Sequence, residues 1–102
     1  MIKLVEVKRI REYNVMERKA HAHFELQEIW INPDSIQQIK PDFSMKNHLS
    51  NGFLPEGLSS QQLFSKIQYG VWSNVAIAIV VGAPEAVVEK IYKSSPKEIL
   101  RG

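Results

Sequence analysis

Residues 71–93, VWSNVAIAIVVGAPEAVVEKIYK, decide the fold of this chain. Between residues 71 and 81, valine, isoleucine and alanine occupy both alternate sets of positions, so both faces of an extended segment would be apolar. That pattern is typical of a central strand covered on both sides. We therefore predict one buried strand over residues 71–81.

A helix is predicted directly after this strand. Gly82 lets the chain leave the strand, Pro84 suits the first turn of a helix, and Glu85 favours its amino terminus. An apolar face then recurs at helical spacing, at Val87, Val88 and Ile91. Glu89 and Lys93 stand one turn apart and can pair.

The pattern of side chains in the amino-terminal half predicts strands joined by turns. Residues 2–7 are rich in β-forming side chains, and a turn is expected near residues 12–14. Residues 19–27 alternate between apolar and polar side chains, which predicts an amphipathic strand.

The apolar positions of this second strand change parity, from Phe24 and Leu26 to Ile29 and Ile31. Because a strand with one buried face keeps one parity, we predict a bulge near residues 27–28. The sequence Asn-Pro-Asp-Ser at 32–35 predicts a turn, followed by a short strand up to residue 40.

The remaining segments carry weaker patterns. Residues 43–58 hold enough Asn, Gly and Pro to predict a long loop. Ser59 and Gln62 form a capping-box pattern ahead of Leu63, Phe64 and Ile67, which predicts a short helix. Residues 96–102 are predicted to form a tail. The expectation is one α+β domain over residues 1–102, with a small antiparallel-rich β-sheet, a short internal helix and a carboxy-terminal amphipathic helix.

Composition limits the class of protein. The 102 residues carry a formal net charge of +2 and no cysteine, so disulfide frameworks and thiolate metal sites are excluded. The longest apolar run is far shorter than the roughly 20 residues that span a bilayer. The first residues lack the pattern of a signal peptide. We expect a cytoplasmic protein with no membrane partner.

Three blocks of sequence resemble a known family. They are the opening MIKL at residues 1–4, IWINPDSI at residues 29–36, and VVGAPEAVVEKI at residues 80–91. The chain resembles the small bacterial flagellar and swarming motility proteins of the FlbD/SwrD type and related short phage proteins. That resemblance implies strands and a terminal helix at these blocks, and it brings no catalytic residues.

No pattern of catalysis or cofactor binding is present. The nucleophile elbow, the dinucleotide fingerprint and the phosphate loop are all missing, so a protein without enzymatic activity or cofactor is expected. His21 and His23 share one side of a predicted strand, but a closed metal site usually needs four ligands. We read them as solvent-facing. The basic residues near the amino terminus alternate with glutamates, so nucleic acid is not the expected partner.

Aromatic residues gather in a segment that is poor in charge. Five of the nine aromatic residues lie between positions 43 and 72. Aromatic enrichment with few charges is typical both of an interface and of a core, and both readings stay open. The candidate partner-binding residues are Phe53, Leu54, Phe64, Tyr69 and Trp72.

Two functions are therefore predicted. The first is a binding or regulatory protein, related to phage or motility proteins, that acts through contacts with a protein partner or with copies of itself as a homo-oligomer. The alternative is a protein that binds a small ligand or nucleotide between subunits. Its candidate ligand-binding residues are Arg9, Arg11, His21 and His23.

Overall fold

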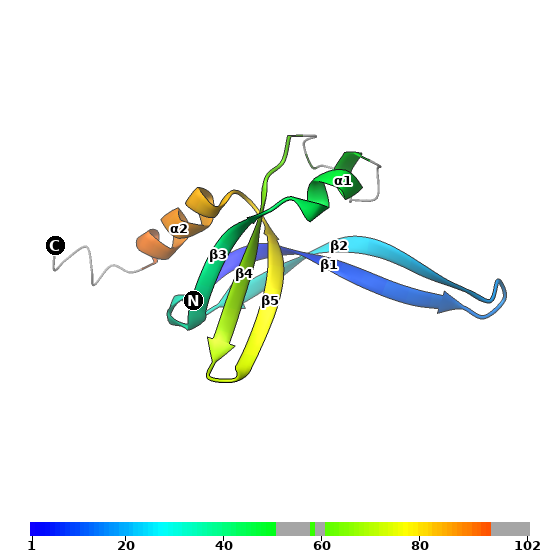
Figure 1. Cartoon of the computed structure of the whole chain (residues 1–102), viewed down its shortest axis with the longest axis horizontal. Coiled ribbons are helices and arrows are strands. Elements are labelled where there is room, and N and C mark those ends of the chain that lie inside the picture. Colours follow the sequence, from blue (N-terminus) through cyan, green and yellow to red (C-terminus); the bar gives the residue numbers. More distant parts are fainter. Residues whose placement is uncertain (51–57, 59–60, 95–102) are drawn as a thin grey trace, which may run out of the picture.

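The computed structural model describes residues 1–50, 58 and 61–94, and shows a five-stranded antiparallel sheet with helical pieces (Figure 1). The strand order is β2-β1-β5-β4-β3. The strands are β1 (Ile2–Asn14), β2 (Lys19–Ile31), β3 (Ile36–Asp42), β4 (Phe64–Val71) and β5 (Asn74–Val81). The helices are η1 (Pro33–Ser35), α1 (Ser44–Ser50) and α2 (Pro84–Lys93). The predicted α+β class, antiparallel sheet and carboxy-terminal helix are confirmed. Short internal helical pieces are present as well, but at η1 and α1 and not at the predicted position.

The first hairpin is continuous, so the predicted bulge near residues 27–28 is wrong. β1 and β2 pair without a register shift from Ile2 opposite Ile31 to Asn14 opposite Lys19. The parity change has another cause. Ile29 packs against one core cluster and Leu26 against a second one, so β2 is covered on different faces along its length.

The two core clusters lie on opposite faces of the sheet. The cluster below α2 contains Ile2, Leu4, Ile31, Ile67, Ala78, Val80 and Val87. The cluster below α1 contains Val7, Met45 and Phe64, with Phe24, Leu26, Leu58, Ile79 and Val81 packed around it. Neighbouring residues of β5 alternate between the clusters, as the period of a strand requires.

The segment predicted as one strand over residues 71–81 is instead the end of β4, a turn, and β5. Val71 pairs with Asn74, so Trp72 and Ser73 form the turn. Trp72 has a φ of 58° and Gly70 a φ of 143°. A Cβ atom at Gly70 would collide with the carbonyl oxygen of Asn74, so only glycine fits there.

The helix predicted from residue 59 onward is also wrong where the chain is described. Phe64 and Ile67 belong to β4 and are buried on opposite faces of the sheet. A spacing of three residues fits both a helix and the two faces of a strand, and pairing with β3 and β5 decides between them. Ser59 lies outside the described residues.

A helix occupies the first part of the segment predicted as a loop. α1 begins after Asp42, whose carboxylate accepts hydrogen bonds from the Met45 amide at 3.1 Å and from the Ser44 hydroxyl at 2.9 Å. This carboxylate satisfies free donors at the start of the helix. The rest of the predicted loop, apart from Leu58, and the predicted tail at 96–102 lie outside the described residues.

The predicted turn at 32–35 and the carboxy-terminal helix are confirmed. The Asn32 side chain accepts a hydrogen bond from the Asp34 amide at 3.0 Å. α2 buries Val87 in the sheet, and Lys93 pairs with Glu89 at 3.0 Å. At the start of α2, the Ser65 hydroxyl donates to the Gly82 carbonyl at 2.7 Å and ties the helix to β4.

The molecule is elongated because the first hairpin extends past the rest of the sheet as an arm (Figure 1). Its extents are 60 × 33 × 19 Å and its radius of gyration is 16.1 Å. A compact chain of this length has a radius of about 13 Å. β1 and β5 are paired at one position, Glu6 opposite Val80, and then diverge.

Among the described residues, no helix is both long and apolar enough to cross a membrane.

Candidate protein-binding surface

The structure separates the residues predicted to bind a partner. Phe64 is 3% exposed and belongs to the core, so its assignment to a surface is corrected. Tyr69 is half-buried and packs against the cluster on the other face of the sheet. Trp72 is 91% exposed. Phe53 and Leu54 lie outside the described residues. Aromatic composition cannot distinguish core from surface, and of this set Trp72 alone is shown to be fully accessible.

Exposed apolar side chains lie near the tip of the β4–β5 hairpin. We call Trp72, Val75 and Ile77 the hairpin surface. Val71 is exposed as well, but it lies on the opposite face of the sheet together with Tyr69. Val75 and Ile77 are 43% and 58% exposed, although β5 is the central strand of the sheet. This exposure could not be predicted from the sequence, because a strand covered on both faces and an uncovered strand can have the same apolar composition.

The exposure arises because the first half of β5 has a neighbouring strand on one side only. β5 pairs with β4 along its whole length, but its pairing with β1 is confined to Val80. In an antiparallel pair, alternate residues direct their backbone groups away from the partner. With a two-residue turn at Trp72 and Ser73, this geometry directs the backbone groups of Val75 and Ile77 away from β4. The Val75 amide turns back to the Ser73 carbonyl at 3.2 Å.

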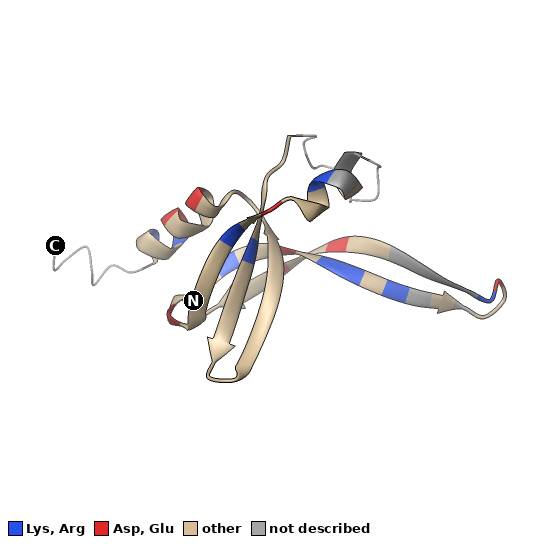
Figure 2. Cartoon of the chain, in the orientation of Figure 1, with Lys and Arg blue, Asp and Glu red and all other residues tan. Residues whose placement is uncertain are grey.

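This open edge lacks the features that usually prevent strand pairing. Exposed edges are normally protected by charged residues, especially lysine, or by proline. The outer strand β3 carries both, as Lys40 and Pro41. β5 has neither, and Figure 2 shows it without a charged residue. The open edge of β5 is therefore suited to bind a further strand.

The arm carries the residues predicted to bind a ligand, but it places those whose side chains are described on different faces and not in one site. Arg9 stands opposite Phe24, and Ile10 stands opposite His23. Because directly opposite residues share a face and neighbours along a strand alternate, Arg9 and Arg11 lie on the face opposite to His23. The backbone of His21 pairs with that of Glu12, and its side chain is outside the described set.

His23 belongs to a solvated row of polar side chains. Its Nε2 atom lies 3.1 Å from Oε1 of Glu25, and Gln27 donates to the other oxygen of Glu25 at 3.4 Å. The hydrogen bond from His23, followed by that from Gln27, lowers the pKa of the Glu25 carboxyl below its ordinary value. The described residues contain no group of three or more His, Asp or Glu side chains that could hold a metal ion.

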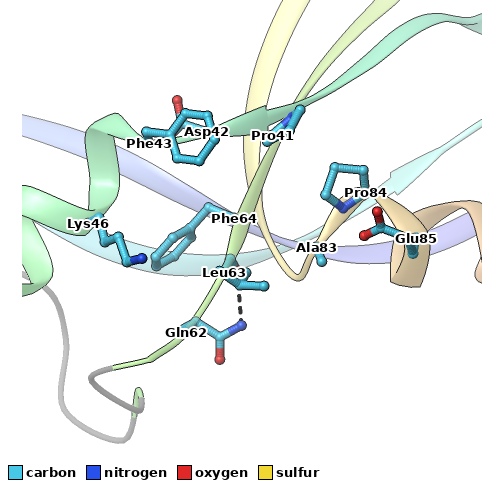
Figure 3. A pocket seen from close by; sticks show the side chains of 10 residues that line it. All are labelled: Pro41, Asp42, Phe43, Lys46, Gln62, Leu63, Phe64, Ala83, Pro84 and Glu85. Atoms are coloured by element: carbon cyan, nitrogen blue, oxygen red, sulfur yellow. Dashed lines mark hydrogen bonds between the residues drawn. The ribbon is translucent and has the colours of Figure 1, made fainter.

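A small cleft lies between the end of β3 and the start of α2 (Figure 3). Its volume is about 210 Å³. The walls are mainly apolar and include Pro41, Phe43, Leu63, Phe64, Ala83 and Pro84, while Asp42, Lys46, Gln62 and Glu85 complete the lining. The Asp42 carboxylate is already engaged by the start of α1. The cleft suits an apolar side chain, and its described lining presents no arrangement of acid, base and nucleophile.

No protein-family model matches this chain, and neither a curated protein nor a solved structure is significantly similar to it. The resemblance to flagellar and swarming motility proteins therefore stays a prediction.

Proposed function

We propose that this chain is a non-enzymatic binding protein that associates with another polypeptide by adding a strand to the open edge of β5. One observation carries the proposal. The central strand of the sheet exposes Val75 and Ile77 on an uncharged edge that is paired on one side only. In strand addition, backbone hydrogen bonds supply affinity, and contacts of alternate side chains supply specificity.

Trp72 supports the same function. It stands at the tip of this hairpin, 91% exposed, with its backbone in the left-handed region. Tryptophan is among the residues that dominate binding energy at protein interfaces. A large exposed ring on a strained backbone contributes little to folding, which favours a role in contact with a partner.

The partner that best fits this edge is a second copy of the chain. Residues 71–81 carry no charge, so two β5 strands can approach in antiparallel order without repulsion between opposed side chains. Such pairing is isologous, because the same edge serves both subunits around a two-fold axis. It would join two sheets into one and cover the hairpin surface of each copy.

A matched pair of lysine substitutions tests this proposal. Val75 on β5 and Val88 on α2 are 43% and 39% exposed, so a lysine side chain at either position can extend into solvent. We expect Val75→Lys to convert a dimer into a monomer and Val88→Lys to leave the dimer intact, as measured by size-exclusion chromatography with light scattering. Circular dichroism checks that both variants fold. A monomeric wild-type protein, or equal masses for the two variants, would contradict the proposal.

A further inference from the structure

Two lysines face each other on the face of the sheet that also carries α1. Lys40 of β3 stands directly opposite Lys66 of β4, and Figure 2 shows the two basic positions side by side. Phe64, two residues before Lys66, belongs to the cluster below α1. Since residues two apart on a strand share a face, both lysines lie on the face away from α2. Both are exposed.

Neither lysine has a carboxylate partner in the described part of the chain. Lys3 and Lys93, by contrast, pair with Glu28 at 3.8 Å and with Glu89 at 3.0 Å. Asp42 is the nearest acidic residue along β3, and its carboxylate accepts hydrogen bonds at the start of α1. Like charges directly opposite each other destabilise a sheet, so this pair costs stability unless an anion joins it.

The surface between the lysines is hollow, and its lining is mainly polar. A concavity of about 180 Å³ is lined by Gln38, Lys40, Lys66, Gln68 and Ile77. β3 has a bulge between Ile36 and Gln38, and glutamine side chains near this bulge are joined by hydrogen bonds. Gln68 donates to the Gln37 side chain at 2.9 Å, and Gln37 donates to the Gly70 carbonyl at 3.4 Å. None of the described residues that line the concavity is acidic.

We propose that this concavity binds a phosphate group between Lys40 and Lys66. A phosphate concentrates negative charge and acceptor oxygens in one compact group, and lysine is an established point-charge ligand for it. Opposite side chains in a sheet have Cβ atoms about 5 Å apart, so two ammonium groups can converge on one anion. Ile77 at the rim offers an apolar contact for the organic part of a phosphate ester. An acidic peptide presents its charges further apart and fits this close pair less well.

This site is independent of strand addition at β5. It uses the face of β3 and β4, whereas the proposed dimer uses the edge of β5. The side chain of Ile77 lines the concavity while its backbone lies at the edge of β5, so the test relies on the lysines and leaves Ile77 unchanged.

The test compares two double variants with the same loss of charge. Lys40→Gln with Lys66→Gln removes the unpaired lysines, and Lys3→Gln with Lys93→Gln removes two that have carboxylate partners. Inorganic phosphate, adenosine monophosphate and a pentaglutamate peptide are titrated into each protein, and amide NMR shifts of β3 and β4 are followed. We expect phosphate and the nucleotide to bind the wild type saturably. The first variant should lose at least about tenfold in affinity, and the second should stay close to wild type.

The titrations also distinguish the source of the phosphate. Tighter binding of adenosine monophosphate identifies a phosphate ester that contacts Ile77, and equal binding identifies the free anion; both support the proposed site. Three results overturn it: no saturable shift, an equal loss in both double variants, or tighter binding of pentaglutamate than of either phosphate compound. The proposed dimer is unaffected by any of these results.

Discussion

Trp72 combines an unfavourable backbone conformation with an exposed side chain. Its φ of 58° lies in the left-handed region, and its ring is 91% exposed. A side chain in that region costs about 1 kcal/mol or more, whereas glycine adopts it freely. Glycine also loses more entropy on folding, by about 0.5 kcal/mol.

We therefore predict that, in the monomeric Val75→Lys background, Trp72→Gly raises the free energy of unfolding by about 0.5 kcal/mol, the difference between those two terms. Urea unfolding measures the change. Trp30→Gly is the matched control, because Trp30 is 60% exposed, lies in an extended strand and sits below Lys3 at 5.9 Å. That control should lose stability. An equal loss in both variants would show that Trp72 supports the fold.

At the scale of elements, the amino terminus of α2 lacks a hydrogen bond from a capping side chain. Ala83 is the N-cap residue and forms no hydrogen bond through its side chain. Its φ of −69° and ψ of 157° suit a serine, whose hydroxyl can accept from the free amides of the first turn.

We predict that Ala83→Ser raises the free energy of unfolding by about 1 kcal/mol, as measured by urea denaturation. Ala86→Ser, at an exposed position inside the same helix, should lower it by about 0.5 kcal/mol. The opposite signs test the capping geometry. If Ala83→Ser also destabilised the protein, the first turn of α2 would have to begin elsewhere.

The elements also show which sequence signals carry structural information. Gly82 and Pro84 located α2, and Asn32 located the turn at η1, because each constrains the local backbone. Phe64 and Ile67 misled the prediction, because a short apolar set fits both a helix and a strand. The hairpin surface could not be found from sequence, because the accessibility of Ile77 depends on where β1 leaves β5. Likewise, Lys40 and Lys66 meet through pairing between β3 and β4, which residues 43–63 separate in the sequence.

At the scale of the molecule, the sheet consists of two parts joined at one paired position. β3, β4 and β5 form one part, and the long hairpin of β1 and β2 forms the other. Both core clusters draw on the base of that hairpin, through residues such as Leu4, Val7 and Leu26. Neither cluster includes a described residue between positions 11 and 22. The described side chains of the outer arm therefore lie outside both clusters, and an isolated two-stranded hairpin is marginally stable.

We predict that the outer arm is dispensable for folding. Replacing residues 11–22 with Asn-Gly, a favoured two-residue hairpin turn, should change the free energy of unfolding by less than about 1 kcal/mol. Leu4→Ala is the comparison, because Leu4 is 1% exposed and its truncation should cost about 2–5 kcal/mol. Urea denaturation measures both, and small-angle scattering in the monomeric Val75→Lys background should show the radius of gyration falling from 16.1 Å toward that of a compact chain. A loss in the shortened protein as large as that of Leu4→Ala would mean that the arm stabilises the sheet. The expected result would leave the arm free for a purpose other than folding.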